Sequence, residues 1–169
     1  MITLHPCRNK KEDARIAFSW RNDPATIASS YIQLPKTWAS FWFEFNAGYF
    51  ENPEFSPVFI MEGNEPVGFI RFEPASLPEY PDKTIIEVMI NIAPGRRGEG
   101  IGTEALIILQ NHMKNKNVFA LTADIRKTNR ASVNAFQKAG FYFFCERTEY
   151  IEKTKENCCI LCYLCKLEG

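Results

Sequence analysis

The apolar residues of this chain fall into short runs whose periods predict both strands and helices. Runs rich in β-branched and aromatic side chains, alternating or continuous and bounded by turn-forming residues, predict strands. These are Ile2–Pro6, Val58–Glu62, Val67–Phe72, Thr84–Ala93, Val118–Ile125, Phe141–Thr148 and Cys158–Lys166. Runs in which apolar residues recur every three to four positions predict helices. These are Glu12–Trp20, Thr37–Phe50, Thr103–Lys116 and Arg130–Ala139.

The order of these elements predicts an α/β fold with a mixed sheet of six to seven strands and about four helices. The helix Thr103–Lys116 connects two strands, and a strand–helix–strand crossover implies that those strands are parallel. Antiparallel hairpins are expected at both ends of the chain, the first of them around Gly63. The polar segment 22–35 and the proline-containing segment 76–82 are predicted loops. A chain of 169 residues is expected to form one domain, residues 1–169.

Composition and charge exclude several classes of protein. Apolar residues make up 46% and charged residues 24% of the chain, as in a globular domain. Twenty basic residues balance 20 acidic ones, which argues against a nucleic-acid partner. No apolar run reaches the ~20 residues that span a bilayer, and the N-terminus lacks the layout of a signal peptide. We therefore expect a cytoplasmic protein with no membrane partner, either a monomer or a homodimer.

Four of the six cysteines lie close together near the C-terminus and form two overlapping C-x-x-C spacings. Such spacings occur in zinc sites, where they lie on turns. Here Cys159, Cys162 and Cys165 fall on a predicted strand without Gly or Pro, and successive pairs would face opposite sides of it. We therefore predict no metal site and interpret the cysteines as small apolar residues.

A basic, glycine-rich segment, Arg96–Gly102, follows the apolar run Ile85–Ile92 and precedes a predicted helix. Glycines let a backbone approach a ligand closely, and the first turn of a helix presents unpaired N–H groups to an anion. The two arginines add positive charge. The segment therefore predicts a pyrophosphate site. It lacks the Gly-Lys-Ser/Thr of a Walker loop and the G-x-G-x-x-G spacing of a Rossmann turn. An ordinary tight turn is the alternative.

A second motif lies near the predicted helix Arg130–Ala139. Asn129 is suited to cap that helix, and Gly140 is suited to end it. Together with Ser132, Lys138 and Phe141, these residues resemble the pattern N-x-x-S-x-x-x-Y-x-K-x-G-F. The glycine-rich segment, read as R-x-x-G-x-G, resembles the acyl-CoA loop of the same family, the GNAT superfamily of N-acetyltransferases.

The resemblance implies a fold, a cofactor and a set of cofactor-binding residues. The two parallel strands would splay apart, and the pantetheine of acetyl-CoA would lie between them like an added strand. The residues that match the family's cofactor site are Met89, Ile90, Asn91, Ile92, Arg96, Arg97, Gly98, Glu99, Gly100, Ile101, Gly102, Thr103, Asn129, Ser132, Phe136 and Lys138. The implied activity is acetyl transfer from acetyl-CoA to a primary amine by direct attack in a ternary complex.

Two carboxylates are candidate catalytic residues. An acceptor amine must lose a proton before it attacks, because an alkyl ammonium has a pKa of about 10. Glu87 lies on the strand before the loop, where many GNAT enzymes have a glutamate. Asp124 ends the next strand, five residues before Asn129, as an aspartate does in aminoglycoside 6′-N-acetyltransferases. The alternatives are an exposed strand position for Glu87 and a turn cap for Asp124.

Phe136 departs from the family pattern, because many GNAT enzymes have a tyrosine there whose hydroxyl protonates the leaving thiolate. Phenylalanine cannot donate a proton, so Tyr142 or a water would have to substitute, or the thiolate would leave unprotonated. The branch that resembles ribosomal-protein N-terminal acetyltransferases also lacks this tyrosine.

The acceptor is the least determined part of the prediction. The segment Trp20–Pro24 and the tryptophan-rich helix after it resemble acetyltransferases of nucleotide-linked amino sugars, although a histidine usual in them is missing. We expect a small-molecule amine such as an amino sugar, contacted by Asn22, Trp38, Trp42 and Arg71. Alternative acceptors are a protein N-terminus or an aminoglycoside, whose positive charges would suit the acidic residues Glu73, Glu79, Asp82 and Glu87. Alternative classes of protein are a non-catalytic acetyl-CoA sensor and a protein-interaction domain that does not bind acetyl-CoA.

Overall fold

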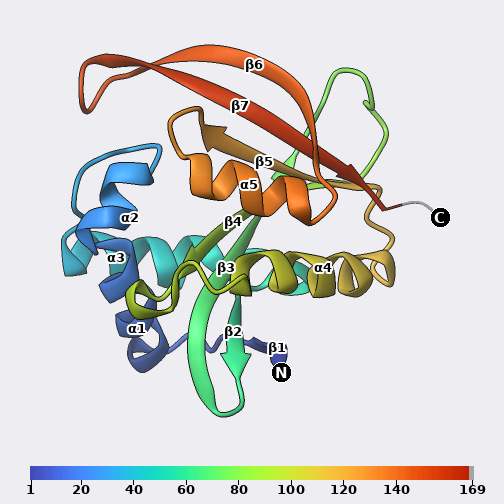
Figure 1. Cartoon of the computed structure of the whole chain (residues 1–169). Coiled ribbons are helices and arrows are strands. Elements are labelled where there is room, and N and C mark those ends of the chain that lie inside the picture. Colours follow the sequence, from blue (N-terminus) through green and yellow to red (C-terminus); the bar gives the residue numbers. More distant parts are fainter. Residues whose placement is uncertain (168–169) are drawn as a thin grey trace.

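A computed structural model describes residues 1–167, and its centre is one seven-stranded mixed sheet (Figure 1). The strand order across the sheet is β1-β2-β3-β4-β5-β7-β6. Only β4 and β5 are parallel, as the crossover predicted, and every other neighbouring pair is antiparallel. The strands are β1 (Ile2–Pro6), β2 (Val58–Glu62), β3 (Glu65–Ala75), β4 (Ile85–Ile92), β5 (Ala120–Arg126), β6 (Tyr142–Ile151) and β7 (Glu156–Lys166).

Helices cover both faces of the sheet. On one face lie α4 (Ile101–Lys114) and α5 (Arg130–Lys138), which share the largest apolar core with residues such as Ile70 and Leu121. On the other face, α1 (Lys11–Arg21) and α3 (Trp38–Glu44) pack against Phe59 and Phe69, the sequence neighbours of core residues on the first face. The alternation of side chains along each strand therefore gives each face of the sheet its own apolar core, and two smaller apolar clusters lie around Ile85 and Ile160.

The parallel pair β4–β5 is short and then opens. Its register joins Ile85 to Ala120, Ile86 to Leu121 and Glu87 to Thr122, and no later residues are paired. On its other side β4 continues to pair with β3 as far as Ile92. The second half of β4 therefore has no strand on its β5 side. This is the splayed pair that the resemblance implied.

The prediction missed one helix. The segment 22–35, predicted as a loop, contains α2 (Pro24–Ser29). The Asp23 carboxylate accepts hydrogen bonds from the backbone N–H groups of Ala25 and Thr26, at 3.1 and 3.4 Å, and Pro24 occupies the first turn. These are ordinary signals for the start of a helix. A segment of only six residues gives too short a window for an apolar period to be recognised.

Other differences concern the extent of elements. The predicted helix Thr37–Phe50 is α3 followed by a π-helical turn at Phe45–Tyr49. Strands β3 and β6 extend three residues beyond their predicted C-terminal ends, to Ala75 and Ile151. All six cysteines are free, and residues 1–167 contain no cluster of three metal-ligating side chains. None of the helices in this range is long and apolar enough to span a membrane.

Candidate active site

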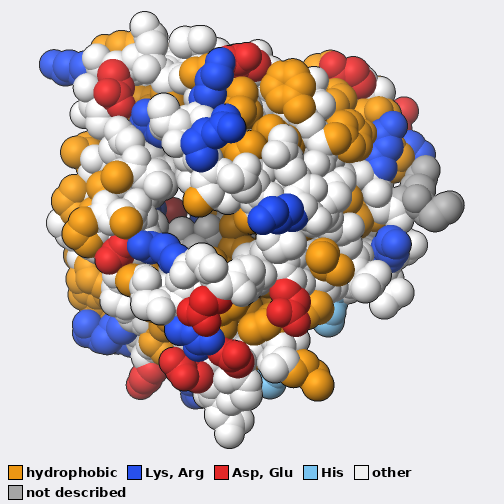
Figure 2. Space-filling model, in the orientation of Figure 1, with side chains coloured by type: hydrophobic (Ala, Val, Ile, Leu, Met, Phe, Trp, Pro, Cys, Tyr) orange, Lys and Arg blue, Asp and Glu red, His pale blue; other side chains and the backbone are white. Residues whose placement is uncertain are grey.

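A cavity of about 840 Å³ lies where β4 and β5 diverge, and Figure 2 shows the face of the molecule on which it is hollowed. Residues from α1, α2, α3, β3, β4, α4, β5, α5 and β6 line it. The cavity therefore extends from the glycine-rich segment on one side to the charged ends of β3 and β6 on the other. We call these two sides the cofactor half and the acceptor half.

The cofactor half begins with the turn that follows β4. Gly98 and Gly100 have φ angles of +77° and +80°, a left-handed conformation that favours glycine. Gly100 is the N-cap of α4 and offers no side-chain capping bond. The N–H groups of the first helical turn, at Ile101, Gly102 and Thr103, consequently have no intrahelical acceptor. These residues line the cavity, and the turn therefore fits a pyrophosphate.

The two arginines of the turn have protein partners. Arg97 donates to the Asp23 carboxylate at 3.0 Å and to the Thr26 hydroxyl, both of which belong to the start of α2. Arg96 forms ion pairs with Glu62 and Glu99. Both guanidinium groups lie at the cavity, but neither is free. A phosphate would therefore share Arg97 with α2 or take it from α2.

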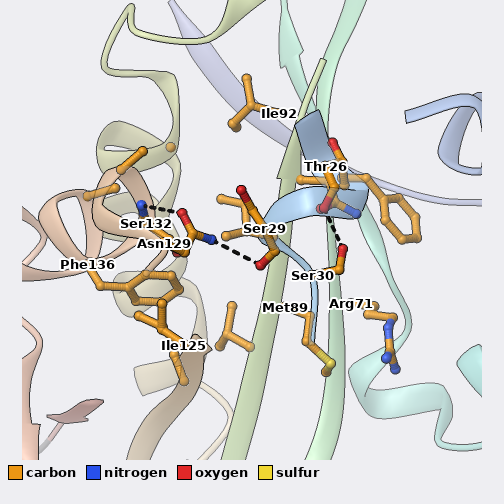
Figure 3. A pocket seen from close by; sticks show the side chains of 18 of the residues that line it. Thr26, Ser29, Ser30, Arg71, Met89, Ile92, Ile125, Asn129, Ser132 and Phe136 are labelled. Carbon is orange, nitrogen blue, oxygen red and sulfur yellow. Dashed lines mark hydrogen bonds between the residues drawn. The ribbon is translucent and has the colours of Figure 1, made fainter. Parts of the chain in front are cut away.

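The α5 side of the cofactor half contains the second sequence motif. Asn129 accepts a hydrogen bond from the backbone N–H of Ser132 at 3.2 Å, which confirms its predicted role as the cap of α5. Its amide also donates to the Ser29 carbonyl across the cavity, at 3.5 Å (Figure 3). Phe136 is 2% exposed and packs edge-to-face on Phe141, 4.9 Å between ring centroids. Lys138 also lines the cavity.

Glu87 lies at the last paired position of the parallel strands. Its side chain lines the cavity and, among residues 1–167, has no hydrogen-bond partner. Burial, followed by the negative charges of Asp124 and Glu73, raises the pKa of Glu87 to about 7. A carboxylic acid with this pKa exchanges its proton near neutral pH, as a general base must.

Asp124, the second predicted catalytic residue, lies close to Glu87 but in a different environment. Arg147 of β6 binds both of its oxygens, at 3.3 and 2.6 Å. A bidentate guanidinium fixes the orientation of a carboxylate and takes up one lone pair of each oxygen. Asp124 is therefore less available as a base than Glu87, and its negative charge contributes to the raised pKa of Glu87.

The acceptor half is a group of charged side chains around Arg71. The Arg71 guanidinium lies over the Tyr49 ring, 4.7 Å from its centroid, and pairs with Glu73. Lys36 and Glu44 form an ion pair at 2.6 Å beside it. Arg21 completes the group from the end of α1. Arg71 and Glu73 of this group were named from the sequence, but Arg21, Lys36, Glu44 and Tyr49, which lie far from β3 in the chain, were not.

Four predicted site residues do not line the cavity. Asn22 exchanges hydrogen bonds with the backbone of Lys36, at 2.7 and 2.9 Å, and so has a structural role. Trp38 and Trp42 stack on each other at 6.0 Å and pack in the core under α1. Glu99 is paired with Arg96 outside the cavity. The helical period that places Trp38 and Trp42 on one face also explains their burial in that core.

Tyr142, considered as a replacement for the missing tyrosine, is 45% exposed on β6 and does not line the cavity. Two of the four acids that kept an aminoglycoside open, Glu79 and Asp82, are likewise absent from the lining. The aromatic side chains that do reach the cavity are Tyr31, Phe41, Tyr49, Phe69 and Phe136.

The segment that includes α2 crosses the mouth of the site. Arg126 of β5 donates to the carbonyls of Ser30 and Tyr31, at 3.1 and 3.0 Å. The Tyr31 hydroxyl also donates to Glu149 of β6. In Figure 3, Thr26, Ser29 and Ser30 face Asn129 and Ser132 across the cavity. The helix that the prediction missed is thus part of the wall of the site.

Comparison with known proteins agrees with this geometry. The family model of the acetyltransferase (GNAT) domain matches residues 2–142, and the chain belongs to this family. It is therefore an acyltransferase, and acetyl-CoA is the acetyl donor of GNAT enzymes.

Solved structures share the fold over nearly the whole chain. An N-acetyltransferase from Staphylococcus aureus Mu50 is 23% identical, with 99% of each chain covered and a TM-score of 0.76. The aminoglycoside acetyltransferase AAC(6')-Ib in complex with coenzyme A is 17% identical, with 98% of this chain and 95% of that one covered and a TM-score of 0.76. A proposed phosphinothricin N-acetyltransferase is 22% identical, with both chains covered completely and a TM-score of 0.79. At sequence identities of 17–23%, these similarities show a shared fold and leave the acceptor open.

Proposed function

We propose that this protein acetylates a primary amine of a small molecule, with Glu87 as the general base. The observation that carries the proposal is the position and chemistry of Glu87. It lies at the point where the parallel strands separate, lines the cavity, and has a pKa raised to about 7. A half-buried carboxylate without a hydrogen-bond partner costs stability, and a functional role explains why it stands there.

The cofactor half supplies binding through main-chain groups. Acetyl-CoA provides the activated acetyl thioester. The first-turn N–H groups of α4 would hold its pyrophosphate, and the free edge of β4 at residues 88–92 would hydrogen-bond its pantetheine. This assigns binding roles to Met89, Ile90, Asn91 and Ile92, which all line the cavity.

Glu87 would accept a proton from the acceptor ammonium, either directly or through one water. Asp124, held by Arg147, would keep the pKa of Glu87 high enough for this transfer. Phe136 offers no hydroxyl to the leaving sulfur. Ser132 lies one turn earlier on α5 and also lines the cavity, so it is the candidate donor on this helix.

A small-molecule acceptor fits a cavity of about 840 Å³ that the cofactor would also occupy, and an amino sugar is the first candidate class. Tyr31 and Tyr49 would supply its aromatic contacts, in place of the tryptophans. A polycation such as the kanamycin bound in one AAC(6')-Ib structure is less suited, because Arg21, Lys36, Arg71 and Arg147 line the same space as the acids.

The test compares the parent protein with Glu87→Gln. We expect CoA to bind both with similar affinity in calorimetric titrations. Acetyl transfer to a panel of amines should fall at least about 100-fold in the variant, the usual contribution of a general base. In the parent, kcat/KM should rise with pH through about 7, as Glu87 loses its proton, and this inflection should be absent from the variant.

The matched control is Glu65→Gln, at an exposed position on the hairpin away from the cavity, which should retain parental rates. Equal rates and pH profiles for the parent and Glu87→Gln would exclude Glu87 as the base. Failure of CoA to bind the parent would exclude the cofactor site itself.

A further inference from the structure

Most charged side chains of the acceptor half form ion pairs with one another. Lys36 binds Glu44 at 2.6 Å, Arg147 binds Asp124 at 2.6 Å, and Arg71 binds Glu73. Two charged groups of this half of the cavity remain outside these pairs, the Glu87 carboxyl and the Arg21 guanidinium. The unmatched groups therefore comprise one carboxyl and one cation.

Arg21 is incompletely bonded. Its Nη2 donates to the backbone carbonyls of Ile32 and Leu34, at 3.0 and 3.4 Å, and no carboxylate of residues 1–167 forms an ion pair with it. Its Nη1 is buried and has no acceptor, one of two such side-chain atoms in that range. The negative charge of Glu44 acts on Arg21, but the Glu44 carboxylate is already paired with Lys36. A buried donor without an acceptor is unfavourable, so Arg21 can take a further anionic partner.

Arg71 connects the two unmatched groups. Its positive charge acts on the titration of both Glu87 and Arg21, so it lies within electrostatic range of each. The Arg71 guanidinium also lies over the Tyr49 ring, and one of its nitrogens donates to the Glu73 carboxylate. The remaining N–H groups of a guanidinium can bind a second oxygen acceptor. Arg21 and Arg71 both line the cavity, and together they add two positive charges to the lining of the acceptor half.

We infer that the acceptor carries an anionic group beside its amine, with the amine at Glu87 and the anion at Arg21 and Arg71. This inference rests on the proposed function and specifies its substrate class. Paired guanidinium groups bind carboxylate and phosphate through the same fork of N–H donors. The shared chemistry is therefore a planar or tetrahedral oxyanion, which an amino acid or a phosphorylated amino sugar would each provide.

The experiment measures acetyl transfer to two matched pairs of amines. Butylamine and 4-aminobutyrate differ by a carboxylate, and glucosamine and glucosamine 6-phosphate differ by a phosphate. Initial rates with acetyl-CoA give kcat/KM for each member. We expect a preference of at least tenfold for the anionic member of one pair, and the pair that shows it identifies the anion.

Arg21→Gln tests the assignment to a residue. It should lower the ratio of kcat/KM between the anionic and the neutral member at least about fivefold, by raising KM for the anionic member. The control is Arg15→Gln, which removes the same charge from the same helix but lies over the Trp38 ring, outside the cavity. Arg15→Gln should keep the parental preference.

Equal kcat/KM for both members of both pairs in the parent overturns the inference, even if Glu87-dependent acetylation supports the proposed function. An equal loss with neutral and anionic amines in Arg21→Gln also overturns it. If Arg21→Gln does not fold, Arg21→Lys keeps the charge but not the fork, and it should retain part of the preference. Absence of both CoA binding and acetyl transfer would overturn the proposed function, and this inference with it.

Discussion

The cofactor half and the acceptor half of the cavity are built from different parts of the chain. The cofactor half is one nearly continuous stretch, β4 to α4 with α5 after it, and it presents main-chain N–H groups and glycines to the cavity. The acceptor half gathers charged side chains from α1, β3, α3 and β6. Main-chain recognition suits a ligand that does not change, whereas side-chain recognition can be altered one residue at a time.

The two halves also differ in how complete they are without ligand. The first-turn N–H groups of α4 face the cavity and need no rearrangement. In the acceptor half, the Glu87 carboxyl has no hydrogen-bond partner among residues 1–167, and Nη1 of Arg21 is buried without an acceptor. The main-chain groups of the first half are therefore pre-organised, although Arg97 is held by α2, and the second half has unsatisfied polar groups that a bound acceptor would satisfy.

Gly102→Val should damage the cofactor half alone and produce the largest change in CoA affinity. A Cβ at Gly102 would have ordinary contacts, 3.8 Å from Ile92, and its φ is not left-handed, so the fold should tolerate the change. Its side chain would occupy space next to the first-turn N–H groups. We expect CoA affinity to fall about 30-fold or more by calorimetry, or 2 kcal/mol.

Gly95→Val is the matched control, because it lies in the same turn region with open space around its Cβ and does not line the cavity. It should bind CoA as the parent does. Gly100→Val is a poorer test, since its φ of +80° adds backbone strain. Parental CoA affinity in Gly102→Val would contradict the assignment of the turn to the pyrophosphate.

Glu87→Gln changes one residue of the acceptor half, and it should raise the free energy of unfolding of the protein at high pH. The folded-state pKa of about 7 exceeds the ordinary value of 4.5, so the folded protein holds this proton more tightly than the unfolded chain. Stability is therefore lost as the pH rises from about 4.5 to 7. Removing the charge should recover about 2 kcal/mol at pH 8, allowing for partial solvent screening.

Thermal melts at several pH values check this prediction. The parent and Glu87→Gln should melt alike near pH 4.5, and the variant should melt about 4–8 °C higher at pH 8. A difference that does not change with pH would show that the substitution acts through packing rather than through charge.

Asp23→Asn should have the smallest effect, and it tests the contact between the start of α2 and Arg97 of the glycine-rich turn. Asparagine can still cap α2, but it removes the charge that holds Arg97. Arg97 would then be free to bind phosphate, and CoA affinity should rise about two- to threefold at low salt, the worth of an exposed ion pair. Asp82→Asn, away from the cavity, is the control. Weaker CoA binding would mean that Asp23 positions Arg97 rather than competing for it.

The same contrast explains which parts of the molecule the sequence could predict. A glycine turn, a helix cap and a strand–helix–strand order are local, so Gly100, Asn129 and the parallel pair were recognisable from spacing alone. Glu87 was identified because it interrupts an apolar strand at a position defined by the cofactor turn.

The acceptor half was predicted poorly for physical reasons. Trp38 and Trp42 were expected at the ligand, but a helical stripe does not specify which of two apolar surfaces it meets, and here it meets the core under α1. Arg21 was passed over in favour of its neighbour Asn22, although Arg21 lines the cavity. Whether a side chain faces the cavity depends on how α1, α3 and β3 pack together, and spacing along the chain does not contain that information.

The free edge of β4 beyond Glu87 has a consequence for how such an enzyme can diversify. If the donor is held there by peptide groups, selection on donor binding acts on the path of the backbone and hardly at all on residue identity. Met89 and Asn91, which line the cavity, could then mutate toward new acceptors without loss of the donor. Because donor binding would depend on the backbone and acceptor binding on side chains, a lineage could change its acceptor repeatedly while the acetyl-transfer reaction stays the same.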